Sequence, residues 1–260
     1  MGASSTQLPD GRTIFVGGEH EDFYDQDFWI YNDVVVFRAG KIEIYGYPKE
    51  ILQPTDFHTA TAVGDMILII GCIGYPADRR NGKTPVYGLH LNGYRISELQ
   101  TSGEAPGWIS KHEAHIRPGG RISVSGGSIL VEQNGEWRVR RNLEDYELDL
   151  KSLVWSRLTS RNWRQFQIRQ SDRTAFLLED RPKPKSLVPI EIECAVVACD
   201  DWNQCRIEVE GIQVSLTVGV SCIEIVIEGN LSEKMSMRIA QEVLARAEET
   251  THRKCILELL

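Results

Sequence analysis

The chain has 260 residues, of which 42% are hydrophobic and 25% charged, and its formal net charge is −8. This length and composition predict a globular protein that buries a sizeable core in one large or two small domains. The acidic balance argues against nucleic acid or an anionic membrane as a partner, and no apolar run reaches the roughly 18 residues that cross a bilayer. No charged-then-apolar signal peptide opens the sequence, so we expect a cytoplasmic protein.

Three segments share a pattern of small or polar residues, then a turn, then an apolar run that ends in glycine. They are residues 2–18, 58–72 and 112–127. The glycines that end the runs, Gly17, Gly71 and Gly126, stand 54 and 55 residues apart. The turns carry the glycine, proline and aspartate typical of hairpins, and the runs are rich in β-branched residues. A fixed period of this kind indicates a repeat protein.

Two more strands are predicted in each repeat after a variable loop. The third strands are residues 31–37, 87–91 and 146–150, and the fourth strands are residues 41–45, 94–99 and 153–158. Each repeat therefore predicts four short antiparallel strands.

This arrangement resembles the kelch repeat, which forms one blade of a β-propeller. The residues that carry the resemblance are His58-Thr59-Ala60, His112-Glu113-Ala114, Gly17-Gly18, Gly71, Gly126-Gly127, Tyr31, Tyr87, Tyr146 and Trp155. The sequence departs from the family pattern at Cys72, which replaces the second glycine of the second repeat. Phe57 and Lys111 also stand where the family often has an arginine.

The resemblance implies three blades, at about residues 2–50, 51–108 and 109–160. Three blades are too few to close a ring, because propellers usually have four to eight. The flat faces at the two ends of the arc would stay exposed, which is costly. We expect the C-terminal segment, a second copy that completes six blades, or a partner to cover them.

The last quarter of the chain has a different character. Residues 163–187 are predicted as a connecting segment, and residues 188–260 as a small α+β module. Strands are expected at 189–199, 205–210, 212–218, 222–228 and 254–260, and a helix opens near Ser232. The fold class is therefore mainly β, with a three-bladed partial kelch-like propeller in residues 1–162 and an α+β module after it.

The six cysteines show neither a paired metal-binding spacing nor CxxC. They are Cys72, Cys194, Cys199, Cys205, Cys222 and Cys255. We expect reduced thiols that are mostly buried in strands.

No catalytic motif emerges from the sequence. His112 and His115 are three apart on a predicted strand, so their side chains point to opposite faces and cannot share a metal. Gly82-Lys83-Thr84 imitates the end of a phosphate loop, but the glycine that should precede it is Ala77. We read His58 and His112 as structural, and we expect no cofactor, no metal and no enzymatic activity.

An acidic segment in the first blade is the leading candidate for function. Its carboxylates are Glu19, Glu21, Asp22, Asp25 and Asp27, and its aromatics are Phe23, Tyr24, Phe28 and Trp29. The segment lacks the central glycine and closing glutamate of an EF-hand loop. Three interpretations stay open: a solvated loop, a calcium site, or a docking surface for a basic protein. Aromatic side chains are frequent in binding hot spots, which favours docking over calcium.

The matching loop of the second blade is basic and contains Arg79 and Arg80. Trp108, on the connection to the third blade, could belong to either the core or the rim. We include these three residues with the acidic segment as candidate partner contacts, because loops on a rigid scaffold often carry function.

We therefore expect a non-enzymatic interaction module that presents propeller loops to a protein partner, which could be basic. Such a module could be an adaptor, or a neutralising, immunity-type partner of a basic enzyme or toxin. One alternative is a metal- or small-molecule-dependent enzyme, since some kelch-like propellers of the galactose oxidase type are enzymes. The other is a self-assembling homodimer with a six-bladed ring.

Overall fold

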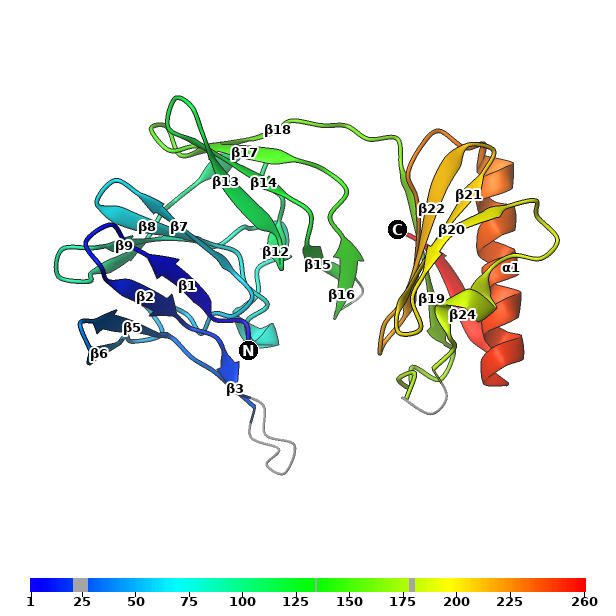
Figure 1. The fold of residues 1–260 in the computed structure, drawn as a ribbon, viewed down its shortest axis with the longest axis horizontal. Coiled ribbons are helices and arrows are strands. Elements are labelled where there is room, and N and C mark those ends of the chain that lie inside the picture. Colours follow the sequence, from blue (N-terminus) through cyan, green and yellow to red (C-terminus); the bar gives the residue numbers. More distant parts are fainter. Residues whose placement is uncertain (21–27, 134, 178–180) are drawn as a thin grey trace. The chain divides into compact units, whose positions relative to one another are not determined.

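The computed structural model describes residues 1–20, 28–133, 135–177 and 181–260. The acidic residues 21–27 lie outside the described part of the chain. The described chain forms two compact units, residues 1–160 and 161–260. The first contains three larger β-sheets in succession and two smaller ones, and the second contains a β-sheet with a long helix (Figure 1).

The first unit contains three blades, each built on four antiparallel strands. Blade one has the order β1 (Ser4–Gln7), β2 (Thr13–Val16), β5 (Asp33–Arg38) and β6 (Lys41–Gly46). Blade two contains β7 (Thr59–Val63), β8 (Met66–Ile70), β9 (Val86–His90) and β10 (Ile96–Glu98). Blade three contains β13 (Glu113–Arg117), β14 (Arg121–Ser125), β17 (Tyr146–Asp149) and β18 (Val154–Arg157). This is the predicted partial propeller.

Shorter elements extend the blades. β3 (Glu19–His20) pairs with β4 (Trp29–Ile30) in the loop of blade one, and β11 (Ser102–Gly103) runs parallel to β18. A further sheet joins β12 (Trp108–Ser110), β15 (Ser128–Gln133) and β16 (Glu136–Arg141), and a short 3-10 helix covers Pro76–Asp78. The loop predicted in blade three is thus a hairpin that pairs with the strand entering the blade.

Apolar side chains between neighbouring blades form the core of this unit. One cluster joins Ile14, Val16, Val34 and Val36 of blade one to Ile67, Ile69, Tyr87 and Leu89 of blade two. A second joins Leu68, Ile70 and Val86 of blade two to Ile122, Val124, Tyr146, Leu148 and Trp155 of blade three. Because side chains alternate along a strand, blade two has one apolar face for each neighbour.

The repeated glycines lie where the backbone of the next blade comes closest. Gly17 and Gly71 have φ values of 52° and 72°, and an added Cβ would overlap the carbonyl oxygens of Thr55 and Ile109. The following amides donate to the same oxygens, from Gly18 to Thr55 at 2.8 Å and from Cys72 to Ile109 at 2.9 Å. Cys72 fits at the second position because its backbone does not adopt the positive φ of Gly18 (101°) and Gly127 (76°).

Gly126 has the same kind of backbone conformation, with φ 63°, but no heavy atom lies within 4 Å of an added Cβ. In the first two blades this space is filled by the following blade. Among the described residues, no following blade occupies the corresponding space beside blade three.

One residue of the predicted pattern needs correction. Tyr87 and Tyr146 lie opposite Ile69 and Val124 on the neighbouring strand, and both are buried. The equivalent position of blade one, opposite Phe15, is Val35. Tyr31 lies before β5 and is 43% exposed, so it is not the repeat tyrosine.

The second unit is a six-stranded antiparallel sheet with one helix on it. The strand order is β20 (Ala195–Cys199), β21 (Gln204–Val209), β22 (Ile212–Val218), β23 (Ile223–Ile227), β19 (Arg164–Gln170) and β24 (Cys255–Leu259). Alternate residues of these strands, such as Ile207 and Leu216, share a core with the helix stripe Ile239, Val243 and Ala247.

Helix α1 (Glu233–Thr251) begins and ends with ordinary capping chemistry. The Ser232 hydroxyl accepts the Met235 amide at 3.2 Å, as predicted for an N-cap, and His252 closes the helix in the left-handed conformation. Among the described residues, no helix combines the length and apolar character needed to span a bilayer.

The predicted connecting segment 163–187 is wrong in its first part. Arg164–Gln170 is an interior strand, β19, bonded to β23 on one side and β24 on the other, and a 3-10 helix covers Pro184–Leu187. The strand carries only two apolar side chains, Phe166 and Ile168, between polar neighbours. Its place in the sheet depends on pairing with a strand about 90 residues later, which local sequence does not reveal.

The expectation that every cysteine is a reduced thiol is also corrected. A disulfide joins Cys199 and Cys205, which lie directly opposite each other on β20 and β21. Cys72 and Cys222 are free and buried, and Cys194 and Cys255 are free and half-buried. The two cysteines are six positions apart in sequence, but the hairpin brings their side chains together.

The glycine geometry predicts different costs for the same substitution at two repeat positions. Gly126→Ala should cost about 1–2 kcal/mol, for the left-handed backbone alone. Gly71→Ala should cost at least about 2 kcal/mol more, because the new Cβ overlaps the backbone of Ile109. Urea unfolding of both variants measures the difference, and equal losses would contradict an open end at Gly126.

Candidate functional site

The described ends of the acidic segment pair with each other as β3 and β4 in the loop of blade one. Glu19 pairs with Ile30 and His20 with Trp29, and the Trp29 side chain is 60% exposed. Of the other candidate contacts in this segment, Glu21, Asp22, Phe23, Tyr24, Asp25 and Asp27 lie outside the described residues. The structure thus places the two ends of the candidate loop and exposes its last aromatic side chain.

The loops of blades one and two meet at Tyr75. The Tyr75 hydroxyl accepts the Ile30 amide at 2.8 Å and lies 3.4 Å from the carbonyl oxygen of Phe28. The described residues that follow the acidic segment therefore contact the loop of blade two that carries Arg79 and Arg80.

The three candidates outside the acidic segment differ in their availability to a partner. Arg79 turns inward, where its guanidinium donates to the carbonyls of Ile73 and Gly74 and lies over the Trp137 ring at 5.8 Å. Arg80 is exposed and lies 3.9 Å from Glu98. Trp108 is 1% exposed and donates its indole N–H to Ile73, so it is a core residue and the rim interpretation is wrong.

The two repeat histidines link neighbouring blades. His58 Nε2 lies 2.8 Å from the Ser4 hydroxyl of blade one, and His112 Nε2 lies 2.9 Å from the Thr59 hydroxyl of blade two. Burial lowers the pKa of each imidazole to about 4, and the proximity of His112 adds to the effect on His58. Both rings are therefore neutral near pH 7 and join one blade to the next.

A polar group lies buried beside these contacts. Asp56 accepts the amides of Ile73 and Gly74 on one oxygen, and its other oxygen has no hydrogen-bond partner among the described residues. Cys72 accepts the Gln53 amide at 3.2 Å, and burial raises the pKa of its thiol to about 12. The thiol is thus protonated and poorly nucleophilic. The described part of the chain contains no group of three or more His, Cys, Asp or Glu placed to hold a metal.

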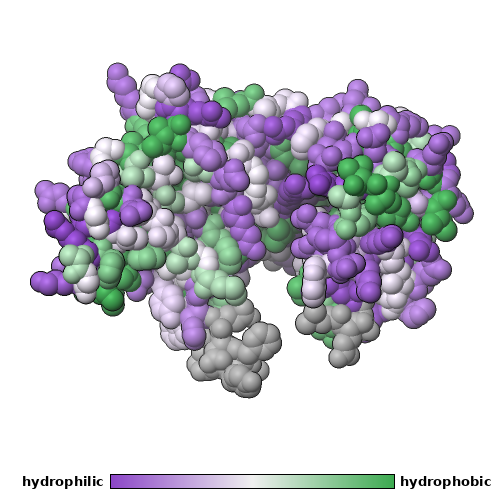
Figure 2. Space-filling view, in the orientation of Figure 1, coloured by the Kyte–Doolittle hydropathy of each residue, from purple (hydrophilic) through white to green (hydrophobic). Residues whose placement is uncertain are grey.

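The free face of blade one is a candidate binding surface that the sequence motifs did not single out. Its members are Phe15, Val35, Phe37, Ile42 and Ile44, which we call the blade-one apolar face. Phe15, Val35 and Ile44 lie opposite one another in one row across the strands, and Phe37 and Ile42 in the next, so all five share a face. Ile42 and Ile44 are 65% and 68% exposed. Figure 2 shows hydrophobic atoms at the lower left, over β5 and β6.

This face is the counterpart of two surfaces that are buried elsewhere in the arc. Phe15 and Val35 match Ile69 and Tyr87 of blade two, which pack on blade one, and Val124 and Tyr146 of blade three, which pack on blade two. In blade one the same positions remain apolar although no described blade precedes it.

The other free end of the arc is charged. The outer face of blade three carries Arg117, Arg121, Ser123 and Glu147, with Arg121 bonded to Glu147 at 3.0 Å and Arg117 to Ser123 at 3.1 Å. A sheet face with charged, hydrogen-bonded side chains can stay in contact with water at little cost in free energy. The two ends of the arc therefore differ in chemistry.

The sequence contains a signal for this difference. Strands with two covered faces read as continuous apolar runs, whereas strands with one covered face alternate. The second strand reads MILII in blade two and RISVS in blade three, whereas it reads TIFV in blade one. Blade one thus has the pattern of a blade covered on both sides.

Comparison with known proteins assigns no family to this chain. No protein-family model matches the sequence, and no curated protein matches it. A solved chain titled "Structure of YjhT" is similar to this chain with a TM-score of 0.42 and 11% sequence identity. The match covers 85% of this chain and 64% of that chain, so this chain spans less than two thirds of its length.

The buried histidines predict a loss of stability in acid. The pKa of each in the folded state lies below the ordinary value of 6.5, so the unfolded chain binds protons more readily between these values. The stabilisation is complete above about pH 6.5 and is lost as the pH falls towards 4. Each histidine should lower the free energy of unfolding by about 2–3 kcal/mol at pH 4.5 relative to pH 7.5.

Urea unfolding at both pH values measures this loss. The variant His112→Gln keeps a hydrogen-bonding group but cannot titrate. It should lose clearly less stability between the two pH values than the parent does, and an equal loss in both proteins would rule out His112 as a source.

Proposed function

We propose that this chain is a non-enzymatic interaction module whose protein partner packs on the blade-one apolar face. The observation that carries the proposal is that this face has the composition of a blade-to-blade contact while remaining exposed. An apolar sheet face of this kind costs free energy in water, and exposed contiguous apolar patches mark interaction sites. Fully burying an isoleucine or phenylalanine side chain contributes about 1.5–3 kcal/mol.

The charge of the outer face of blade three argues against a six-bladed homodimer. In such a ring, blade three of one copy would cover blade one of the other. Placing Arg121 and Glu147 against Phe15 and Ile44 would remove charged groups from water without giving them new partners, which is strongly unfavourable. The occupant is thus better matched by a different protein that presents an apolar sheet face.

The charge of the acidic segment suggests a second property of this partner, a basic surface. The segment from Glu19 to Asp27 follows the glycine pair after β2 of blade one and carries five carboxylates in nine residues. A partner with basic groups beside its apolar face would be attracted by this segment. This supports the view of the chain as an adaptor, or as a neutralising partner of a basic enzyme or toxin.

Substitution of the exposed isoleucines tests the docking face. Ile42→Glu with Ile44→Glu places two charges in the apolar face, whereas Ile116→Glu with Val154→Glu changes two exposed apolar residues of blade three. Affinity capture from native extract, with quantitative mass spectrometry, should find a stoichiometric protein that the first variant loses by at least tenfold and the second keeps. Equal retention by both variants would contradict docking on this face.

The acidic segment is tested separately on the same captured protein. Glu21→Ala, Asp22→Ala and Asp25→Ala together should weaken binding and reduce its salt dependence, because the partner is expected to be basic. Unchanged affinity would show that the acidic segment is not part of the interface, and docking on the apolar face would still stand. Light scattering of the purified chain measures self-association. If the parent forms a dimer that Ile42→Glu with Ile44→Glu abolishes, the occupant of the apolar face is a second copy of this chain and not a different protein.

A further inference from the structure

The second unit has an exposed edge strand that its own sheet leaves open. β20 is the terminal strand, and β21 is its sole neighbour among the described strands. Val196 and Val197 are 50% and 54% exposed, and Ala195 and Ala198 are exposed as well. The register between β20 and β21 shifts between Val196 and Ala198, and on either side of this shift the edge presents amides and carbonyls to an extended chain that can pair with it.

The edge strand is shorter than its neighbour, which creates a groove. Ala195 pairs with Glu208, so Val209, the last residue of β21, and Glu210 in the following turn lie past the start of β20. The chain before Ala195 contacts the helix, where the Glu191 amide donates to Glu242 at 3.2 Å. A groove of about 540 Å³ opens there, with an apolar floor that includes Ile192, Val209 and Met235.

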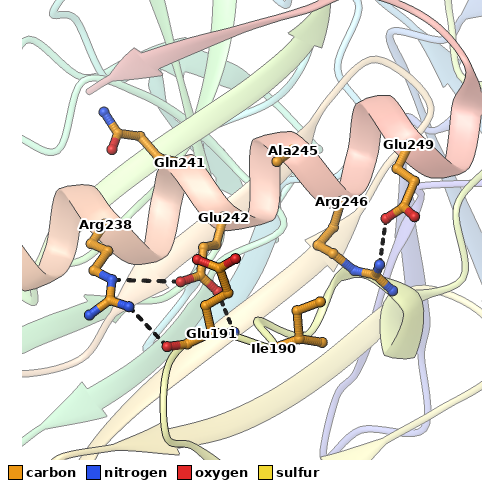
Figure 3. A pocket seen from close by; sticks show the side chains of 8 residues that line it. All are labelled: Ile190, Glu191, Arg238, Gln241, Glu242, Ala245, Arg246 and Glu249. Carbon is orange, nitrogen blue, oxygen red and sulfur yellow. Dashed lines mark hydrogen bonds and ion pairs between the residues drawn. The ribbon is translucent and has the colours of Figure 1, made fainter.

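The walls of this groove are acidic. Glu191, Glu193, Glu208 and Glu210 line it, and Arg238 is the one basic residue among its lining. The Arg238 guanidinium is already engaged, because it donates to the Glu191 carbonyl at 2.9 Å and lies 3.7 Å from Glu242 (Figure 3). The groove therefore carries an excess of negative charge next to an open strand edge.

The edge is also held in a defined position. The Cys199–Cys205 disulfide fastens the end of β20 to β21. In the turn between them, one Asp200 oxygen accepts the amides of Trp202, Asn203 and Gln204 at 2.8–2.9 Å. A strand fixed in this way loses little conformational entropy when a further strand is added.

We propose that the exposed edge of β20 is a second binding site, separate from the blade-one apolar face. It accepts an extended peptide segment with alternating basic and apolar side chains. The peptide backbone adds to the sheet beyond β20, its basic groups meet the glutamates, and its apolar groups enter the groove. Main-chain hydrogen bonds supply affinity in this mode of recognition, and side-chain pockets supply specificity. A second copy is a poorer occupant, because two acidic edges would repel each other.

A peptide-binding experiment tests this edge independently of blade one. The probe is the fluorescein-labelled peptide Lys-Val-Lys-Val-Lys-Val-Lys, titrated with the full chain and followed by fluorescence anisotropy. Glu193→Lys with Glu208→Lys should weaken binding at least tenfold. Glu50→Lys with Glu113→Lys makes the same charge change on exposed residues of the first unit. This control should alter the affinity for the peptide less than twofold.

Two further arms separate strand addition from simple charge attraction. The same peptide with alternate N-methylated amides keeps its charge but cannot form the ladder, and should bind at least tenfold more weakly. The peptide Glu-Val-Glu-Val-Glu-Val-Glu should bind the Glu193→Lys, Glu208→Lys variant better than the parent, which shows that the variant is folded.

Equal binding of the methylated and unmethylated peptides would overturn the proposal, as would equal effects of the two charge variants. A dimer of the parent chain that the Glu193→Lys, Glu208→Lys variant strengthens would also overturn it, in favour of a second copy at the edge. The Ile42→Glu, Ile44→Glu variant should bind the peptide normally, so failure of one surface leaves the other standing.

Discussion

The close approach of each blade to the next is the constraint on which the first unit depends. At Gly17 and Gly71 the backbone of the following blade occupies the space of a side chain, and the amide after each glycine bonds to it. His58 and His112 add one buried link at each seam. This geometry brings the apolar faces of neighbouring sheets together and explains why a glycine recurs where an apolar strand ends.

The same constraint explains why the two ends of the arc differ. A blade face that meets a neighbour must be apolar, and one that meets water can carry ion pairs. The outer face of blade three is of the second kind, with Arg121 bonded to Glu147. The face of blade one with Phe15 and Ile44 is of the first kind, yet it is exposed. The proposed function follows from that mismatch rather than from any catalytic group.

Sequence periodicity was enough to predict the three blades, their glycines and histidines, and the N-cap of α1, because each depends on local pattern. It could not place β19, whose partners lie far along the chain, or bring Cys199 against Cys205. Trp108 was ambiguous because an inter-blade connection can face either core or solvent. The apolar face of blade one was visible as the continuous runs TIFV and VVVF, but the exposure of Ile42 and Ile44 on it could be recognised only from the positions of the described residues.

Site-specific photo-crosslinking tests the central claim most directly. A benzoylphenylalanine introduced in place of Ile44 lies on the blade-one apolar face, and one in place of Ser156 lies on the outer face of blade three. After irradiation in native extract, mass spectrometry of the adducts should find one abundant protein joined at position 44 and absent at position 156. No adduct at position 44, or the same adducts at both positions, would contradict a partner seated on blade one.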